Sequence, residues 1–283
     1  MLIDTLFIQL HTCHMLTLQN QQLEVQLLDP IADQNRFGTR YCTGGYIFQI
    51  IDALHGPVLT GPTYPESFNV FDGQGIPDAF NLGPLRGAGD EALILGTGLC
   101  DLAANVVKEF CRWDIERSAA SVRFVTLQQY GDWRVALTRT ITLAGRTVRS
   151  HTSLHNSGRA PVPMRWFPHP FYPQTIDDEL CWFNTPVDFP ADDAGYARAD
   201  SGFIRRRNGP WNTGYYLPLS HAATAPLTVL QRHPTLGLVA GSCSYAPDFF
   251  PIWGNPQTFS WEPFLERTVA SGQLLEWHID YHF

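Results

Sequence analysis

The chain contains almost no lysine. Of its 19 basic residues only Lys108 is a lysine, and the 27 acidic residues give the 283-residue chain a net charge of -8. Proteins that bind nucleic acid through its phosphates need a basic surface. The composition therefore predicts no nucleic-acid partner. The other basic residues are arginines, whose planar, forked donors suit binding in a fixed geometry.

Long apolar runs and closely paired cysteines are also missing. No stretch approaches the roughly 18 apolar residues of a membrane helix, and the N-terminal MLIDTLFIQLHTCHML lacks the basic start of a signal peptide. The six cysteines are scattered without a C-x-x-C pair, as is typical of free thiols in a reducing compartment. We therefore expect a cytoplasmic protein with no membrane partner.

The residues that are abundant indicate an all-β protein. Hydrophobic residues make up 44% of the chain and charged residues only 16%, which supports a large core, while 23 glycines and 21 prolines interrupt the chain throughout. Residues 275–283 alternate between apolar and polar without a fault, which predicts a half-buried strand. Residues 133–143 and 146–155 form a predicted hairpin around Ala144-Gly145.

Further short strands are expected at residues 122–127, 227–231 and 236–240, and one short helix at 99–110. Many strands at short spacing predict a large antiparallel β-sandwich or barrel with few short helices. We find no repeat, linker or composition boundary, so the whole of 1–283 is interpreted as one domain.

A histidine between two prolines is the first candidate for chemistry. The segment RWFPHPFY places His169 between Pro168 and Pro170, which restrict the backbone on both sides, and aromatic residues flank it. An imidazole held in this way is suited to act as a general acid in a cleft. The alternative is a structural histidine in a proline-rich loop.

An acidic residue among aromatics is the second candidate. In FSWEPF, Glu262 lies between Trp261 and Pro263, and a carboxyl group in apolar surroundings has a raised pKa. Such a group is suited to act as a general base near neutral pH. The alternative is a salt bridge to one of the arginines.

Two further segments have the composition of binding loops. Arg36 and Arg40 lie four residues apart beside glycines in RFGTRYCTGG, and their forked donors suit sugar hydroxyls or a carboxylate. Gln74 lies between glycines in FDGQGIPD. The alternatives are surface ion pairs for the arginines and an ordinary β-turn for the glutamine segment.

Metal binding is the weaker interpretation of the histidine-containing segments. His11 and His14 have no nearby thiol or carboxylate at the spacing of a zinc site, and His278, Asp280 and His282 are typical of a solvated strand face. We therefore predict no metal site.

The order of these segments resembles the galactose mutarotase-like superfamily, which includes the aldose 1-epimerases. RTVRSHTSLHNSGRAPVPMRWFPHPFY resembles the family's strand, turn and histidine segment, and FSWEPFLERTVASGQLLEWHIDYHF resembles its C-terminal glutamate segment and closing strand. The resemblance implies an antiparallel supersandwich and an isomerase of carbohydrate metabolism that interconverts the α and β anomers of a hexose or modified aldose. It also implies that this isomerase requires no cofactor.

The same resemblance implies roles for individual residues. Glu262 would be the base that removes the C1 hydroxyl proton, and His169 the acid that protonates the ring oxygen. We expect the two on opposite sides of one acetal carbon. Substrate-binding candidates are Arg40, Arg36, Gln74, an aspartate (Asp193 or Asp248) and Trp166, with Trp253 as a second stacking residue; core packing is the alternative for both tryptophans.

The sequence also departs from the family pattern. The N-x-x-H-G-G segment with a second histidine is absent, and Gln74 stands in that region. Two other functions therefore stay open: a non-catalytic sugar-binding or sugar-sensing protein, and an accessory domain of a carbohydrate lyase or hydrolase. The expected partner is a small-molecule sugar, and the expected assembly a monomer or homodimer.

Overall fold

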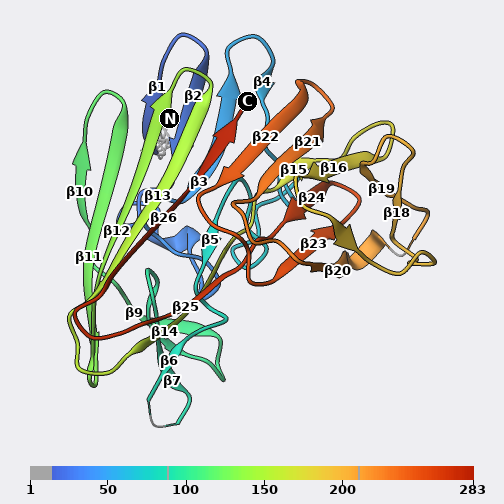
Figure 1. Cartoon of the computed structure of the whole chain (residues 1–283). Helices are drawn as coiled ribbons and strands as arrows, with labels where there is room; N and C mark the ends of the chain where they lie inside the picture. The colour runs from blue at the N-terminus through green and yellow to red at the C-terminus, as the bar shows by residue number, and fades with distance from the viewer. Residues whose placement is uncertain (1–14, 88, 210) are drawn as a thin grey trace, which may run out of the picture.

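The computed structural model describes residues 15–87, 89–209 and 211–283, and in this part of the chain almost all regular structure is β-strand (Figure 1). The largest sheet has ten strands, and all its pairings are antiparallel. Its order is β10 (Asp114–Arg117), β11 (Ser121–Tyr130), β12 (Trp133–Ala144), β13 (Thr147–Asn156), β26 (Leu274–His282), β22 (Gly237–Cys243), β21 (Thr228–His233), β16 (Glu179–Phe183), β19 (Ile204–Arg206) and β18 (Tyr196–Arg198).

Four smaller sheets complete the fold. A five-stranded sheet has the order β15 (Tyr172–Pro173), β24 (Thr258–Trp261), β23 (Phe250–Gly254), β20 (Tyr215–His221) and β17 (Val187–Asp188). A three-stranded sheet has the order β25 (Leu265–Val269), β14 (Val162–Pro168) and β5 (Asp78–Ala79). The two four-stranded sheets are β1 (Leu16–Gln19), β2 (Leu23–Leu27), β3 (Ile47–Asp52), β4 (Gly56–Pro57) and β6 (Leu85–Arg86), β7 (Glu91–Ile94), β8 (Gly98–Asp101), β9 (Val106–Phe110).

Alternating side chains of the long strands form the main core. In β12 and β26 every second side chain is buried, so the predicted hairpin of β12 and β13 and the predicted C-terminal strand are confirmed. The predicted pair near residues 227–240 is β21 and β22. The main core receives apolar side chains from all five sheets, so the all-β antiparallel prediction is confirmed.

The helix predicted at 99–110 is wrong. These residues form the hairpin of β8 and β9, in which Leu99 pairs with Glu109. The Asp101 carboxylate accepts the N–H of Ala104 (2.9 Å), and Asn105 has a positive φ of 54°, which closes a turn. The only helices in the described ranges are two 3-10 turns, η1 (Gln34–Arg36) and η2 (Trp211–Thr213).

A smaller aromatic cluster lies where β5 and β14 meet the loops before β3. Phe167 stacks on Phe264 at 4.4 Å between ring centroids, and Tyr41 and Tyr46 meet edge to face. This cluster carries the segment that contains Arg40 and supports the loop after β14. It therefore positions several of the residues singled out in the sequence.

Candidate active site

Four of the predicted residues, Arg40, His169, Trp253 and Glu262, line one cavity of about 330 Å³. Arg40 comes from the loop before β3, His169 follows β14 and Glu262 follows β24, so three distant segments meet there. The complete wall consists of Arg40, Phe71, Asn81, Leu82, Arg165, Phe167, His169, Tyr216, Phe249, Trp253, Glu262 and Phe264. A few polar groups among aromatic side chains are typical of a small-molecule site.

Both prolines and a stacked ring hold His169. Its N–H donates to the carbonyl of Pro77 (2.8 Å), one residue before β5, and Pro168 pairs with Asp78 across the sheet. The imidazole stacks on Phe171 with centroids 4.3 Å apart. Backbone and side chain are thus fixed together, and the imidazole is almost fully buried at the floor of the cavity.

Glu262 touches His169 directly. Its backbone N–H donates to the carbonyl of Pro251 (3.0 Å), and its Oε1 lies 3.2 Å from Nε2 of His169. The expectation of an acid and a base on opposite sides of one carbon differs from this arrangement, because the two groups lie side by side. Strand β24 ends at Trp261, and Pro263 has no backbone N–H with which to extend its ladder.

A serine completes the row of polar groups. Ser260, two residues before Glu262, is fully buried, and its Oγ lies 3.0 Å from Nδ1 of His169. A hydroxyl can donate or accept, so Ser260 fits either tautomer of the neutral imidazole. Both ring nitrogens of His169 therefore have a partner.

Burial tunes both titratable groups toward their neutral forms. Desolvation raises the pKa of Glu262 to about 8, against the opposing influence of the Arg40 cation. Desolvation, together with Arg40, holds the pKa of His169 well below its ordinary value. At neutral pH the pair therefore carries no net charge: the carboxyl of Glu262 keeps its proton or shares it with Nε2 of His169.

Arg40 is held by aromatic rings rather than by an acid. Its guanidinium lies 5.1 Å from the ring centroid of Tyr41 and 5.0 Å from that of Phe71, and it donates to the Phe71 carbonyl (3.3 Å). Within residues 15–87, 89–209 and 211–283, no ion pair involves Arg40. Its edge is therefore a donor for a ligand in the cavity.

Arg36 and Gln74 lie outside the cavity wall. The Arg36 guanidinium covers the ring of Phe48 at 4.0 Å and lies 3.9 Å from Asp33. Gln74 is completely buried and donates to the carbonyl of Phe48 (3.2 Å). Both support the loops behind Arg40 rather than the cavity.

The other predicted binding residues are placed elsewhere too. Trp166 packs in the core against Trp277, with centroids 5.3 Å apart. Asp248 accepts from Arg267 (2.5 Å), outside this cavity. Asp193 accepts from the hydroxyl of Tyr215 (2.9 Å) and from two backbone N–H groups, which is the role of a loop cap. Trp253, by contrast, does line the cavity.

Sequence reasoning missed four polar residues of this region. Asn81, Arg165 and Tyr216 line the cavity, and Ser260 lies behind it. The Oδ1 of Asn81 is buried and has no hydrogen-bond partner among the described residues. Only Arg165 carried a usable signal, because it precedes His169 by four residues on the strand that leads to it.

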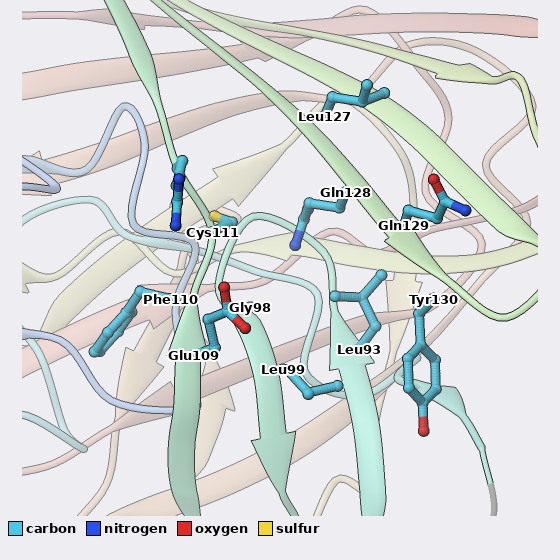
Figure 2. Close-up of a pocket in the computed structure, with 11 residues that line it drawn as sticks. Leu93, Gly98, Leu99, Glu109, Phe110, Cys111, Leu127, Gln128, Gln129 and Tyr130 are labelled. Atoms are coloured by element: carbon cyan, nitrogen blue, oxygen red, sulfur yellow. The ribbon is translucent and has the colours of Figure 1, made fainter.

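Other parts of the described chain offer less chemistry. Figure 2 shows a separate hollow on another part of the molecule, between β8, β9 and β11, whose wall includes Glu109, Cys111 and Tyr130 and none of the predicted residues.

No group of three or more His, Cys, Asp or Glu side chains in residues 15–87, 89–209 and 211–283 is arranged for a metal ion. Nor does this part contain a helix long and apolar enough to cross a membrane. His11 and His14 lie outside the described residues.

Comparison with solved structures identifies the fold. A protein from Escherichia coli K12, named provisionally as an aldose 1-epimerase, superposes with a TM-score of 0.59 at 14% identity over 95% of this chain and 98% of its own. A galactose mutarotase-like protein from Lactobacillus casei gives 0.58 at 13% identity over 95% and 99%. One from Clostridium acetobutylicum gives 0.54 at 10% identity, over 94% of each chain. No family model and no curated protein sequence matches. The chain therefore has the galactose mutarotase-like fold, as its sequence predicted.

Proposed function

We propose that the chain is a cofactor-independent aldose 1-epimerase-like isomerase that interconverts the α and β anomers of a hexose or modified aldose. One observation carries this proposal: a buried carboxyl and a buried imidazole touch at 3.2 Å on the floor of a cavity otherwise lined with aromatic side chains and donors. The five free cysteines of the described residues fit a reducing compartment, so we place the activity in the cytoplasm.

The side-by-side pair suits the geometry of an acetal. The hydroxyl oxygen and the ring oxygen are both bonded to C1, so they lie close enough to meet adjacent catalytic groups together. The competent form of the pair has the carboxylate on Glu262 and the proton on Nε2 of His169. Moving one proton across the 3.2 Å contact gives this form from the uncharged one.

Each proton then has a defined path. Glu262 accepts the proton of the C1 hydroxyl while His169 donates its Nε2 proton to the ring oxygen, and the bond between C1 and that oxygen breaks. The open aldehyde rotates about C1–C2. On closure the ring oxygen attacks the other face of C1 and returns its proton to His169, while Glu262 protonates the new hydroxyl. No net proton is gained or lost, so no cofactor is needed.

The cavity wall would hold the sugar during these steps. Arg40 presents the edge of a preorganised guanidinium to hydroxyl groups, and Asn81 adds a second polar side chain to the wall. Trp253, which meets His169 edge to face at 6.0 Å, offers an apolar surface to the sugar ring. The binding groups thus surround the acid–base pair.

Exchange spectroscopy by NMR on a panel of aldoses tests the proposal. Replacing Glu262 with Gln is expected to lower the catalysed exchange rate at least about a hundredfold, because the amide cannot accept the proton. The matched control is Glu276→Gln, since Glu276 is an exposed residue of β26 on the sheet surface. Unchanged exchange in Glu262→Gln would refute the assignment. Sugar binding without exchange in the unmodified protein would identify a sugar-binding or sensing protein instead.

A further inference from the structure

A second cavity, of about 400 Å³, adjoins the one that contains His169 and Glu262. Leu82 and Arg165 line both, so the two cavities meet at these side chains. The second cavity lies over the pairing of β14 with β25, and the segment 82–84 forms its other wall. The two cavities therefore share a boundary, and the second extends beyond the acid–base site.

Local packing fixes the junction between the cavities. The N–H of Gly83 donates to the carbonyl of Phe80 (3.0 Å), which turns the segment back toward β14. A Cβ at position 83 would lie 3.0 Å from both Cβ and N of Arg165, so glycine permits this close approach. Leu82 beside it is 49% exposed and borders both cavities.

The charges of the second cavity are already balanced. Arg165 pairs with Glu266 (2.9 Å), and Arg267 pairs with Asp248 (2.5 Å). A phosphate or carboxylate would have to compete with these acids for the guanidinium groups. A neutral ligand with hydroxyl groups would not, because a hydroxyl can donate to the acids and accept from the arginines.

The remaining wall includes apolar side chains. Pro84 and Pro163 present pyrrolidine rings, and Leu82 stands between them and the first cavity. The carbon-bound hydrogens of a sugar ring pack well on such surfaces, while its hydroxyls reach the ion pairs at the edge. Balanced charges and apolar side chains in one cavity together favour a second sugar ring over an anion.

We propose that the second cavity is a subsite for the second ring of a reducing disaccharide or oligosaccharide, whose free reducing end lies at His169 and Glu262. This inference rests on the proposed function and specifies its substrate class. Arg165, at the junction, would contact both rings. A monosaccharide would fill only the first cavity.

Blocking the second cavity without touching the first tests the subsite. Thr268 is exposed on β25 and lines only the second cavity, so Thr268→Trp places a bulky ring there. The control is Thr224→Trp, since Thr224 is an exposed residue between β20 and β21 outside both cavities. Thr268→Arg serves as a second blocking variant that adds bulk without an aromatic ring.

Anomer exchange is measured for a 1,4-linked reducing disaccharide of glucose and for glucose itself. The unmodified protein is expected to have a kcat/KM at least about tenfold higher for the disaccharide, from the extra contacts. Both blocking variants should lower kcat/KM for the disaccharide to the value for glucose and leave kcat/KM for glucose unchanged. The control variant should keep both values of the unmodified protein. Equal values for the two sugars in the unmodified protein, or equal losses for both sugars in the variants, would overturn the subsite.

Calorimetric binding separates this inference from the proposed function. If no sugar is exchanged but the disaccharide binds more tightly than glucose and Thr268→Trp removes the difference, the isomerase proposal fails and the subsite stands. If exchange occurs and Glu262→Gln abolishes it, but the disaccharide has no advantage in binding, the subsite fails and the isomerase stands.

Discussion

Two buried pairs of polar side chains behave very differently in this molecule. Arg139 and Asp78 are 1% and 3% exposed in the core, and His169 and Glu262 are 2% and 6% exposed at the cavity floor. The core arginine binds Asp78, Thr152 and Ser150, the last at 2.9 Å. The site pair has one mutual contact, and both of its members border open space.

The number of partners separates a structural pair from a reactive one. The two terminal nitrogens of Arg139 have acceptors in Asp78, Thr152 and Ser150, so this cation holds β12, β13 and β5 together, although burial lowers the pKa of its guanidinium. Glu262 has no such set of donors, so burial raises its pKa to about 8 and leaves the proton mobile. Similar burial thus gives a fixed charge in one place and a titratable group in the other.

The two pairs are also mechanically connected. The carbonyl of Asp78 accepts the N–H of Cys42 (2.8 Å), two residues after Arg40, and the carbonyl of Pro77 accepts the N–H of His169 (2.8 Å). Strand β5 therefore links the core pair to two walls of the cavity. The core pair positions the site without contacting it.

The largest expected effect comes from breaking the core pair. Arg139→Met leaves Asp78 buried without its cation, so we expect a loss of about 3–5 kcal/mol in the free energy of unfolding. Urea denaturation followed by tryptophan fluorescence measures it. The control is Arg149→Met on β13, since Arg149 pairs with Asp280 at the surface (2.7 Å) and should contribute less than about 1 kcal/mol. Equal losses in both variants would contradict the structural role of Arg139.

The pair of His169 and Glu262 should instead make the stability of the folded protein depend on pH. Because the folded pKa of Glu262 is raised to about 8, the folded state retains a proton that the unfolded state has lost, so stability falls as pH rises toward 8. The lowered pKa of His169 acts in the opposite direction, and only below the ordinary histidine pKa of about 6.5. Between pH 6.5 and 8 the glutamate therefore dominates, with a loss of about 1–2 kcal/mol.

Glu262→Gln should remove this loss, whereas Glu276→Gln should keep it because the Glu276 side chain is 54% exposed. Urea denaturation at pH 6.5, 7.25 and 8 measures the difference. If the free energy of unfolding falls with pH as steeply in Glu262→Gln as in the unmodified protein, another group causes the pH dependence. The pair of His169 and Glu262 would then not differ from the core pair in its titration.

Strand periodicity explains how much of the fold was predictable. The alternation in β26 is visible in the sequence because burial on one face demands apolar side chains at every second position. The same periodicity places Arg139 on the inward face of β12, but no local feature of the sequence shows that Arg139 pairs with Asp78 on β5. The segment 99–110 was misinterpreted since its turn depends on Asp101 and a positive φ at Asn105.

The site was predictable where local sequence constrains it. His169 and Glu262 stand out through flanking prolines and aromatics, and both line one cavity. Trp166 was expected at the site, but Val162, Met164 and Trp166 share the inward face of β14, so periodicity alone assigns Trp166 to the core. Asn81 and Ser260 acquire their roles only through contacts between distant segments, which one sequence does not show.

The smallest expected effect tests how the reactive pair is held. Ser260 is a positioning residue, since its hydroxyl lies 3.0 Å from Nδ1 of His169 and it does not line the cavity. Ser260→Ala removes the only partner of Nδ1 among the described contacts, at a cost of about 1 kcal/mol, or roughly a fivefold lower kcat with little change in KM. The protonated imidazole loses its acceptor, so the pKa of His169 should fall further.

The nitrogen chemical shifts of His169, followed from pH 5 to 9, measure the tautomer and its titration directly. Ser260→Thr, which keeps a hydroxyl, should restore the unmodified spectrum. Identical spectra for Ser260→Ala and the unmodified protein would show that the contact does not set the tautomer. The pair of His169 and Glu262 would then depend on its mutual contact alone, whereas Arg139 in the core depends on Asp78, Thr152 and Ser150.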